Sequence, residues 1–261
     1  METIIYNKIG KEYNTTRKAD PYIADKLFQM LAPASGGLYL DIGCGTGNYL
    51  TALAQKGVKF VGIDPSEVMM EQAKAKNNNA SFIQAKAENL PIPDAYFDGA
   101  MALFTMHHWD DIGKGLSELR RVLKPGAHLA CLSFTPQQLR GYWLHNYFPK
   151  MIERSMLTIP AWDEMEKLFS KAGFSKTRTE PYFIREDLQD HFLYSNKTRP
   201  EQYLIPEIRN NASSFTVFSD PEELTQGLIA LEADINSGKI KQVMQDYEND
   251  LGDYLFITAI A

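Results

Sequence analysis

Residues 41–47 read Asp-Ile-Gly-Cys-Gly-Thr-Gly and lie between a short apolar run and a helical pattern. Glycines at alternate positions remove Cβ atoms where the chain must turn sharply and where a ligand lies against the backbone. The N-terminus of the following helix adds unpaired N–H groups and the positive end of its dipole. The next apolar run ends in Asp64, whose carboxylate can accept hydrogen bonds from both hydroxyls of a ribose. Together these features predict a nucleoside-binding site at the carboxyl ends of parallel strands.

Short apolar runs and helical patterns alternate along the first half of the chain. We expect strands at 38–42, 59–63, 80–85, 97–104 and 127–134. The helices between them are expected at 21–31, from 49 to Gly57, from an N-cap at Ser66 to 76, and along the stripe 116–123. Strands that alternate with helices at this spacing imply right-handed βαβ units and a parallel sheet covered on both faces. The predicted fold class is therefore α/β.

The second half of the chain has a different pattern. Asp163 and Glu166 form an acidic variant of the capping box ahead of a helix, and 175–179 is expected to be a strand. The pattern is helical from 185 to about 249, and the chain closes with the β-rich run 254–260. A final strand after a long helical segment predicts an insertion into the sheet domain rather than a separate domain.

The composition is that of a soluble globular protein. The 261 residues include 27 Lys plus Arg and 33 Asp plus Glu, a formal net charge of −6, and 44% are hydrophobic. An acidic balance disfavours binding to nucleic acid or to an anionic membrane, because both attract clustered cations. The two cysteines, Cys44 and Cys131, and the lack of a Cys/His cluster predict no metal site and no disulfide framework. Without a signal peptide or a membrane-spanning apolar run, the chain is expected to be cytoplasmic.

Further motifs follow the glycine loop in order, and with it they form a specific pattern. They are 61–66 (Val-Gly-Ile-Asp-Pro-Ser), 87–91 (Ala-Glu-Asn-Leu-Pro), 97–98 (Phe-Asp), 107–109 (His-His-Trp) and 120–126 (Arg-Arg-Val-Leu-Lys-Pro-Gly). With this pattern the chain resembles the class I S-adenosylmethionine-dependent methyltransferases, in the branch that methylates small molecules. The resemblance covers about residues 6–134, and the rest is similar to proposed methyltransferases of secondary-metabolite and antibiotic biosynthesis.

The resemblance implies an architecture for the whole chain. It predicts a Rossmann-like, mainly parallel sheet of seven strands, with the last strand antiparallel and helices on both faces. Residues 1–135 would form the S-adenosylmethionine-binding core with an N-terminal lid. Residues 136–261 would supply the remaining core strands and a helical substrate cap at about 185–249, inserted before the last strand.

The resemblance also assigns residues to the cofactor S-adenosylmethionine and its product S-adenosylhomocysteine. Loop glycines would line the methionine and ribose, Asp41 would meet the methionine amino group, and Asp64 would hold the ribose. Side chains ahead of the first helix would shield the sulfonium and reach the carboxylate, or else form an ordinary solvated arm. The cofactor candidates are Tyr6, Tyr13, Arg17, Asp41, Gly43, Cys44, Gly45, Gly47, Asp64, Pro65, Met69, Ala87, Glu88, Leu103 and Phe104. One position departs from the family, because Lys86 stands where an acid usually accepts a hydrogen bond from the adenine amine.

The catalytic candidates are two adjacent histidines. His107 and His108 follow the fourth strand, at the rim where a general base would sit. A base is needed only if the nucleophile arrives protonated, since the sulfonium already activates the methyl group. Packing or helix capping is the alternative role for these imidazoles.

Candidate substrate residues lie after the fifth strand and in the cap. They are Trp143, His145, Tyr147, Arg185, Arg199 and Tyr203. The aromatic stretch around residue 143 either lines a pocket for a flat or anionic substrate or forms the core beneath the cap. The cap arginines either pair with a substrate carboxylate or phosphate or belong to a solvated face.

These observations predict a methyltransferase that methylates an oxygen or nitrogen atom, with carbon less favoured, of a small molecule such as a secondary-metabolite intermediate. We expect no nucleic-acid, membrane or metal partner, and a monomer or a homodimer. Two alternatives remain open. One is a non-catalytic protein that binds the nucleoside, and product formation would exclude it. The other is an NAD-linked oxidoreductase, which Asn48 disfavours because the dinucleotide fingerprint requires glycine or alanine there.

Overall fold

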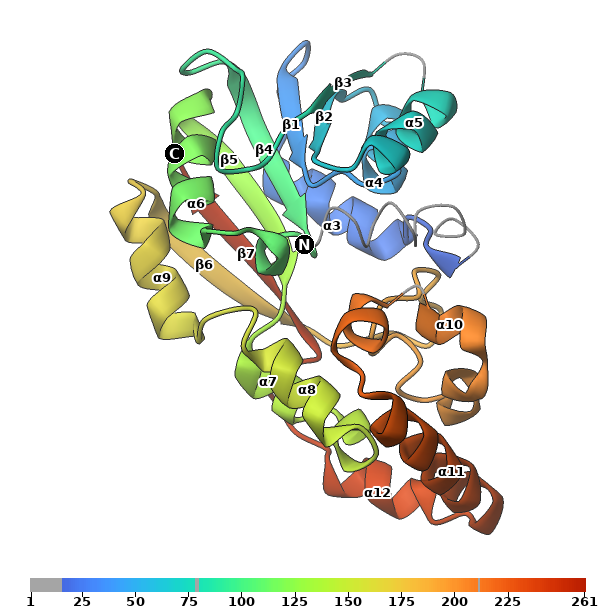
Figure 1. Cartoon of the computed structure of the whole chain (residues 1–261). Helices are drawn as coiled ribbons and strands as arrows, with labels where there is room; N and C mark the ends of the chain where they lie inside the picture. Colours follow the sequence, from blue (N-terminus) through green and yellow to red (C-terminus); the bar gives the residue numbers. More distant parts are fainter. Residues whose placement is uncertain (1–15, 78–79, 211) are drawn as a thin grey trace.

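The computed structural model describes residues 16–77, 80–210 and 212–261, and its centre is one seven-stranded sheet (Figure 1). The strands are β1 (Leu38–Ile42), β2 (Lys59–Asp64), β3 (Ser81–Gln84), β4 (Phe97–Leu103), β5 (Leu123–Ser133), β6 (Ser175–Tyr182) and β7 (Tyr254–Ile260). Their order is β3-β2-β1-β4-β5-β7-β6, and β7 is antiparallel to both β5 and β6. The predicted α/β class, the seven strands and the antiparallel last strand are confirmed.

Several of the helices begin at a residue whose side chain caps them. They are α3 (Pro21–Leu31), α4 (Asn48–Ala54), α5 (Glu67–Lys76), α6 (Ile112–Val122), α7 (Pro136–Arg140), α8 (Pro149–Met156), α9 (Trp162–Lys171), α10 (Pro206–Asn210), α11 (Pro221–Ser237) and α12 (Ile240–Asp246). Ser66 accepts from the Met69 N–H at the start of α5, as expected from the sequence. Asp220 likewise accepts hydrogen bonds from the first turn of α11.

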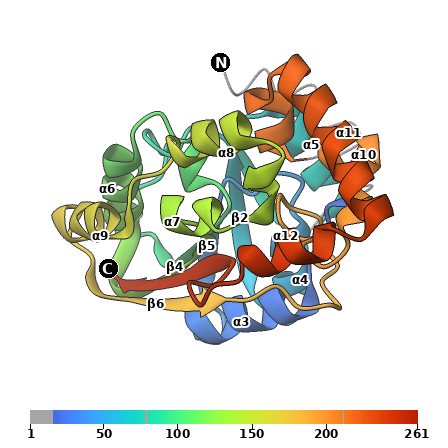
Figure 2. The same ribbon diagram turned by 90° about the horizontal axis from the view of Figure 1, so that it is seen from below.

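The central strands of the sheet are buried on both faces, which explains why they are largely apolar, whereas the edge strand β6 is polar and mostly exposed. Along β5, Ala130 and Leu132 pack on the side of α3 and α4, whereas Leu129 and Cys131 pack on the side of α6 and α9. Successive side chains of a strand point to opposite faces, so an uninterrupted apolar run serves both layers. Figure 2 shows the sheet between these two helical layers.

A helical cap stands at the carboxyl ends of the parallel strands (Figure 1). One part follows β5 and comprises α7, η2 (Trp143–Asn146) and α8. The other part is inserted between β6 and β7 and comprises η3 (Pro200–Leu204), α10, η4 (Ser214–Phe218), α11 and α12. The two parts pack together through α8 with η4 and through η2 with α12. In the described part of the chain, no helix is long and apolar enough to cross a membrane.

Three local expectations are wrong in detail. The helical pattern expected from 185 begins only at Pro200, and the preceding residues from 183 form turns. The helix α9 starts at Trp162 with Ala161 as its N-cap, so Asp163 and Glu166 lie inside the helix and form no capping box. The fifth strand starts at Leu123, because that residue already pairs with Phe97 of β4. The division of the chain at residue 135 stays a prediction.

We predict that Gly227→Ala loosens the cap. A Cβ at this helical glycine of α11 would lie 2.4 Å from the Tyr147 carbonyl oxygen and 2.5 Å from the Phe148 ring. The clash should lower the free energy of unfolding by about 1–3 kcal/mol, although alanine is the better helix former. Gly113→Ala in α6 is the control, because its Cβ would meet nothing closer than 3.3 Å. Denaturant titration should show that this control is neutral or stabilising by up to about 1 kcal/mol; equal effects would contradict the packing.

Candidate functional site

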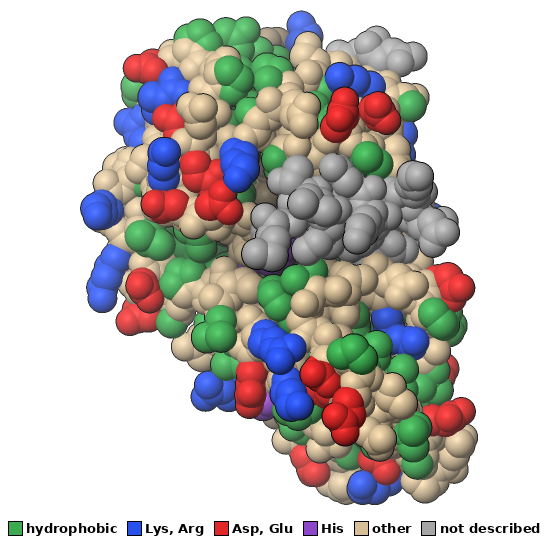
Figure 3. Space-filling view, viewed as in Figure 1, with side chains coloured by type: hydrophobic (Ala, Val, Ile, Leu, Met, Phe, Trp, Pro, Cys, Tyr) green, Lys and Arg blue, Asp and Glu red, His purple; other side chains and the backbone are tan. Residues whose placement is uncertain are grey.

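A cleft of about 1340 Å³, including its open mouth, lies between the carboxyl ends of the strands and the cap. An adjoining cavity of about 450 Å³ continues from it beneath the glycine loop. On the described part of the face in Figure 3, basic and acidic side chains are interspersed.

The glycine loop is held against the end of β2. The backbone N–H groups of Gly43 and Cys44 both donate to the Ile63 carbonyl oxygen, at 2.7 and 3.0 Å. Gly43 has φ +68°, and a Cβ there would lie 2.0 Å from Thr105 Oγ1. Gly45 has φ +52°, and a Cβ there would meet nothing within 4 Å. The loop is thus tight on its protein side, and at Gly45 it offers open backbone to the cleft.

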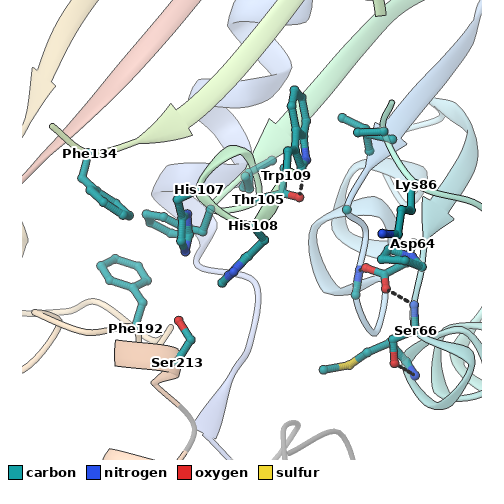
Figure 4. Close-up of a pocket in the computed structure, with 18 of the residues that line it drawn as sticks. Asp64, Ser66, Lys86, Thr105, His107, His108, Trp109, Phe134, Phe192 and Ser213 are labelled. Carbon is teal, nitrogen blue, oxygen red and sulfur yellow. Dashed lines mark hydrogen bonds between the residues drawn. The ribbon is translucent and has the colours of Figure 1, made fainter. Parts of the chain in front are cut away.

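Asp64 is fixed beside this open backbone. Its Oδ2 accepts from the Gly45 N–H at 2.9 Å and its Oδ1 accepts from the Ser66 N–H at 2.8 Å (Figure 4). Burial raises the pKa of Asp64, and these hydrogen bonds together with nearby His108 oppose the rise. A carboxylate oxygen has two acceptor sites, so Asp64 keeps acceptor capacity for hydroxyl groups in the cleft.

A second buried carboxylate lies behind the loop. Asp41 borders the smaller cavity, and burial followed by repulsion from Asp64 raises its pKa well above the ordinary value. Burial also raises the pKa of the Cys44 thiol. The neutral thiol is a poor nucleophile, so Cys44 is not expected to act as one in this cavity.

An ion pair lies at the mouth of the cleft. It involves Lys86, the residue found where the family usually has an acid. Lys86 Nζ lies 2.6 Å from Asp110 Oδ2, and both residues line the cleft. Nearby, Glu88 accepts from the Asp111 N–H at 3.2 Å, while Ala87 and Met69 are buried in the wall. Asp110 therefore places carboxylate oxygens next to the lysine that replaces the usual acid.

Arg17 connects the start of the described chain to the cap. Its Nε lies 2.5 Å from Asp190 Oδ1 and its Nη2 lies 3.2 Å from Asp190 Oδ2. The Tyr49 hydroxyl donates to the same Asp190 Oδ2 at 3.1 Å, and Asp190 is only 1% exposed. Arg17 lines both cavities, so this buried pair fixes the position of a guanidinium at the edge of the cleft.

His107 and His108 lie side by side in the part of the cleft wall that follows β4. Their ring centroids are 3.8 Å apart, and the His107 ring lies 4.8 Å from the Phe134 ring. Figure 4 shows both imidazoles facing the space bounded by Phe134, Phe192 and Ser213. Burial, with smaller contributions from His108 and Arg17, lowers the pKa of His107 well below its ordinary value. His107 is therefore a neutral imidazole near pH 7.

Most of the residues expected at a cofactor site do meet at the two cavities. They are Arg17, Asp41, Gly43, Cys44, Gly45, Asp64, Pro65, Met69, Ala87, Glu88, Leu103 and Phe104, with His107 and His108 beside them. Gly47 instead forms the N-cap of α4, with φ +73°. Tyr6 and Tyr13 lie outside the described residues.

The six candidate substrate residues are absent from the described lining of both cavities. Trp143, Tyr147 and Tyr203 are buried in the aromatic core of the cap, where Trp143 Nε1 donates to the Lys197 carbonyl. His145 is half-buried on η2, and Arg199 is half-buried at the start of η3. Arg185 is exposed and pairs with Asp187. The three rings pack in the core beneath the cap, as large aromatic side chains commonly do.

Sequence reasoning missed the residues that close the cleft from the cap. Phe192, Leu193, Ala212, Ser213 and Ser214 all line it, and so do Thr105 and Phe134 at the ends of β4 and β5. Thr105 and Phe134 could have been predicted, because they lie at or directly after the ends of expected strands, where ligands bind parallel sheets. The cap residues lie in the irregular segment after β6 and around the start of η4, where no periodicity marks a ligand-facing side chain.

Comparisons with known proteins agree with this geometry. Residues 40–131 match the family described as Methyltransferase domain. Over 201 residues the chain is 30% identical to the demethylmenaquinone methyltransferase of Clavibacter sepedonicus, covering 66% of this chain and 81% of that protein. It is 33% identical over 158 residues to the O-methyltransferase resE of Aspergillus sclerotiorum, covering 55% and 57%.

A solved structure is similar over almost the whole chain. It is a proposed methyltransferase from an antibiotic biosynthesis pathway of Anabaena variabilis ATCC 29413, 31% identical, with a TM-score of 0.84. The alignment covers 94% of this chain and 99% of that one. The similarity therefore includes the cap as well as the sheet.

We predict that Asp41→Asn makes the ligand-free protein more stable at neutral pH. Because burial raises the Asp41 pKa, the unfolded chain releases this proton first as the pH rises, and the folded state loses stability. The gain from the substitution should grow in thermal melts as the pH rises above about 4, the pKa of an aspartic acid in an unfolded chain. Asp98→Asn is the control of opposite sign: the Lys124 hydrogen bond lowers the Asp98 pKa, so the destabilisation by this substitution should grow as the pH rises to about 4 and stay constant above it. A gain for Asp41→Asn that is independent of pH would refute the electrostatic explanation.

Proposed function

The chain belongs to the class I S-adenosylmethionine-dependent methyltransferases, and we propose that it methylates an oxygen or nitrogen atom of a small molecule. S-adenosylmethionine, the cofactor of this family, supplies when bound a methyl group on a sulfonium and leaves as S-adenosylhomocysteine. The observation that carries the proposal is the open backbone of Gly45 beside Asp64, in the same cleft as His107 and His108. The name of the relative resE supports oxygen as the acceptor atom.

Different residues of the cleft would bind different parts of the cofactor. Asp64 would accept hydrogen bonds from the ribose hydroxyls, and the loop glycines would lie along the chain between ribose and methionine. Asp41 would attract the methionine amino group, and Arg17 would bind the carboxylate. The apolar wall that includes Met69 and Ala87 would pack on the adenine, with the Lys86–Asp110 pair at its polar edge.

The reaction mainly requires the acceptor atom to be positioned against the methyl carbon. A bond from the acceptor atom to the methyl carbon forms as the carbon–sulfur bond breaks with its electrons, and an acceptor O–H or N–H proton must leave. His107 and His108 are the imidazoles of the cleft available to hold that proton or to orient the group that carries it. The cap closes over the reacting groups and excludes water, which strengthens each polar contact inside.

The first test is calorimetric titration with S-adenosylmethionine, S-adenosylhomocysteine and NADH. We expect binding of the first two only, and a methylated product would exclude a non-catalytic nucleoside-binding role. Asp64→Ala should weaken S-adenosylhomocysteine about a hundredfold, because it removes hydrogen bonds to a charged acceptor. Asp98→Ala is the control, because Asp98 also accepts a backbone N–H, from Leu38 at 3.0 Å, but lies outside the described lining of the cleft. If Asp64→Ala bound S-adenosylhomocysteine as tightly as the wild-type chain, the proposed location of the site would be wrong.

The role of Arg17 yields a separate prediction. Asp190→Asn keeps the size of the side chain but removes the charge that orients the guanidinium. It should weaken S-adenosylhomocysteine about tenfold and leave methylthioadenosine, which lacks the carboxylate, unchanged. Asp187→Asn is the control, since its partner Arg185 is exposed on the surface. If Asp190→Asn weakens both ligands equally, Asp190 acts on the fold and not through Arg17.

A further inference from the structure

The cleft has two halves of different chemistry. Its acidic and lysine side chains, among the described residues, gather near the glycine loop and the mouth: Asp64, Lys86, Glu88 and Asp110. The other half, which we call the acceptor chamber, is defined by two imidazoles, two phenyl rings, a leucine and a serine. They are His107, His108, Phe134, Leu139, Phe192 and Ser213. Arg17 also reaches the cleft, but its charge is matched by the buried carboxylate of Asp190.

Aromatic rings form fixed walls of the acceptor chamber. The Phe192 ring is held by Phe104 and Tyr254, with centroids at 4.7 and 4.8 Å. The Phe134 ring is held against His107. In Figure 4, Phe134 lies next to His107, and Phe192 and Ser213 border the same space as the two imidazoles. Walls of this kind favour a flat ring, which can stack or pack edge-to-face against them.

Among the polar atoms of the chamber, a ring nitrogen of His107 calls for a partner. The Nδ1 atom of His107 is buried and, within the described chain, makes no hydrogen bond. Leaving such an atom unpaired costs free energy, and a ligand hydroxyl would supply the missing bond. The imidazole is neutral, so it can accept a hydrogen bond from an O–H but cannot balance a carboxylate. A carboxylate placed on His107 would lose its hydration without gaining a counter-ion from that imidazole.

We propose that the acceptor chamber binds an uncharged, planar aromatic molecule that carries a hydroxyl group, with the ring against Phe134 and Phe192 and the hydroxyl on His107. This inference rests on the proposed function, because it places the methyl acceptor beside the cofactor half of the cleft. It narrows the acceptor class from any small molecule with oxygen or nitrogen to hydroxylated aromatic compounds. It also assigns the aromatic recognition to Phe192 instead of to the ring cluster around Trp143.

The test compares fluorescent probes that share one ring system and differ in charge. Naphthol, naphthoate and naphthylmethylamine, substituted at the same ring position, are titrated into the full chain in the presence of S-adenosylhomocysteine. Naphthol should bind at least about tenfold more tightly than either charged probe, since desolvating an unpaired charge costs more than about 1.4 kcal/mol. Equal or tighter binding of naphthoate or naphthylmethylamine would overturn the proposal.

Two variants separate the ring contact from the hydroxyl contact. Phe192→Ala should weaken naphthol and naphthalene alike, by about tenfold. His107→Phe keeps a ring but removes the nitrogen, so it should weaken naphthol by about five- to tenfold and leave naphthalene unchanged. His145→Phe on η2 is the control outside the described lining of the cleft. If neither cleft variant changes naphthol binding, the probe binds elsewhere and the assignment is wrong.

Failure of this inference is distinguishable from failure of the proposed function. Calorimetry with S-adenosylhomocysteine reports on the cofactor half, and it also shows that each variant is folded. If S-adenosylhomocysteine binds and naphthol does not, the acceptor class is wrong while the cofactor assignment stands. If S-adenosylhomocysteine does not bind the wild-type chain, the proposed function fails, and naphthol titrated alone then decides on the chamber.

Discussion

The contact between the glycine loop and the end of β2 is the constraint on which the rest of the site depends. Two successive N–H groups, of Gly43 and Cys44, share the Ile63 carbonyl oxygen. On its other side Gly43 touches Thr105, with no room for a Cβ. The turns after β1, β2 and β4 are thereby locked to one another. Only with this arrangement do Gly45, Asp64 and the histidines open onto a common cleft.

The same arrangement concentrates negative charge in a buried place. Asp41 and Asp64 both have raised pKa values, and burial is the main cause for each. A folded state that holds such groups gives up stability near neutral pH, and a cationic ligand would recover it. Such a loss of stability is common at binding sites, where residues that destabilise the ligand-free protein are those that bind the ligand. The mixed charge of this pocket suits a zwitterionic cofactor better than a uniformly anionic one.

The cap does more than cover the cleft, because it takes part in building it. Asp190 comes from the insertion, Arg17 precedes α3 and Tyr49 belongs to α4, yet the three meet in one buried cluster. Phe192, two residues after Asp190, forms a wall of the acceptor chamber. One short segment of the cap therefore contributes to both halves of the cleft. Changes in this segment should alter cofactor and acceptor binding together.

The sequence by itself determined the sheet, the glycine loop and the position of Asp64, because these depend on local rules: side-chain period, caps and positive φ. It also placed His107 and His108 correctly at the end of a strand. Only the tertiary structure decided which side chains of the cap face the cleft. Tyr142 stacks on Tyr194 at 3.8 Å, and such pairs between distant segments bury the aromatic stretch that local reading left open. Which ring is buried and which faces a ligand depends on the partner it meets, and no local pattern encodes that partner.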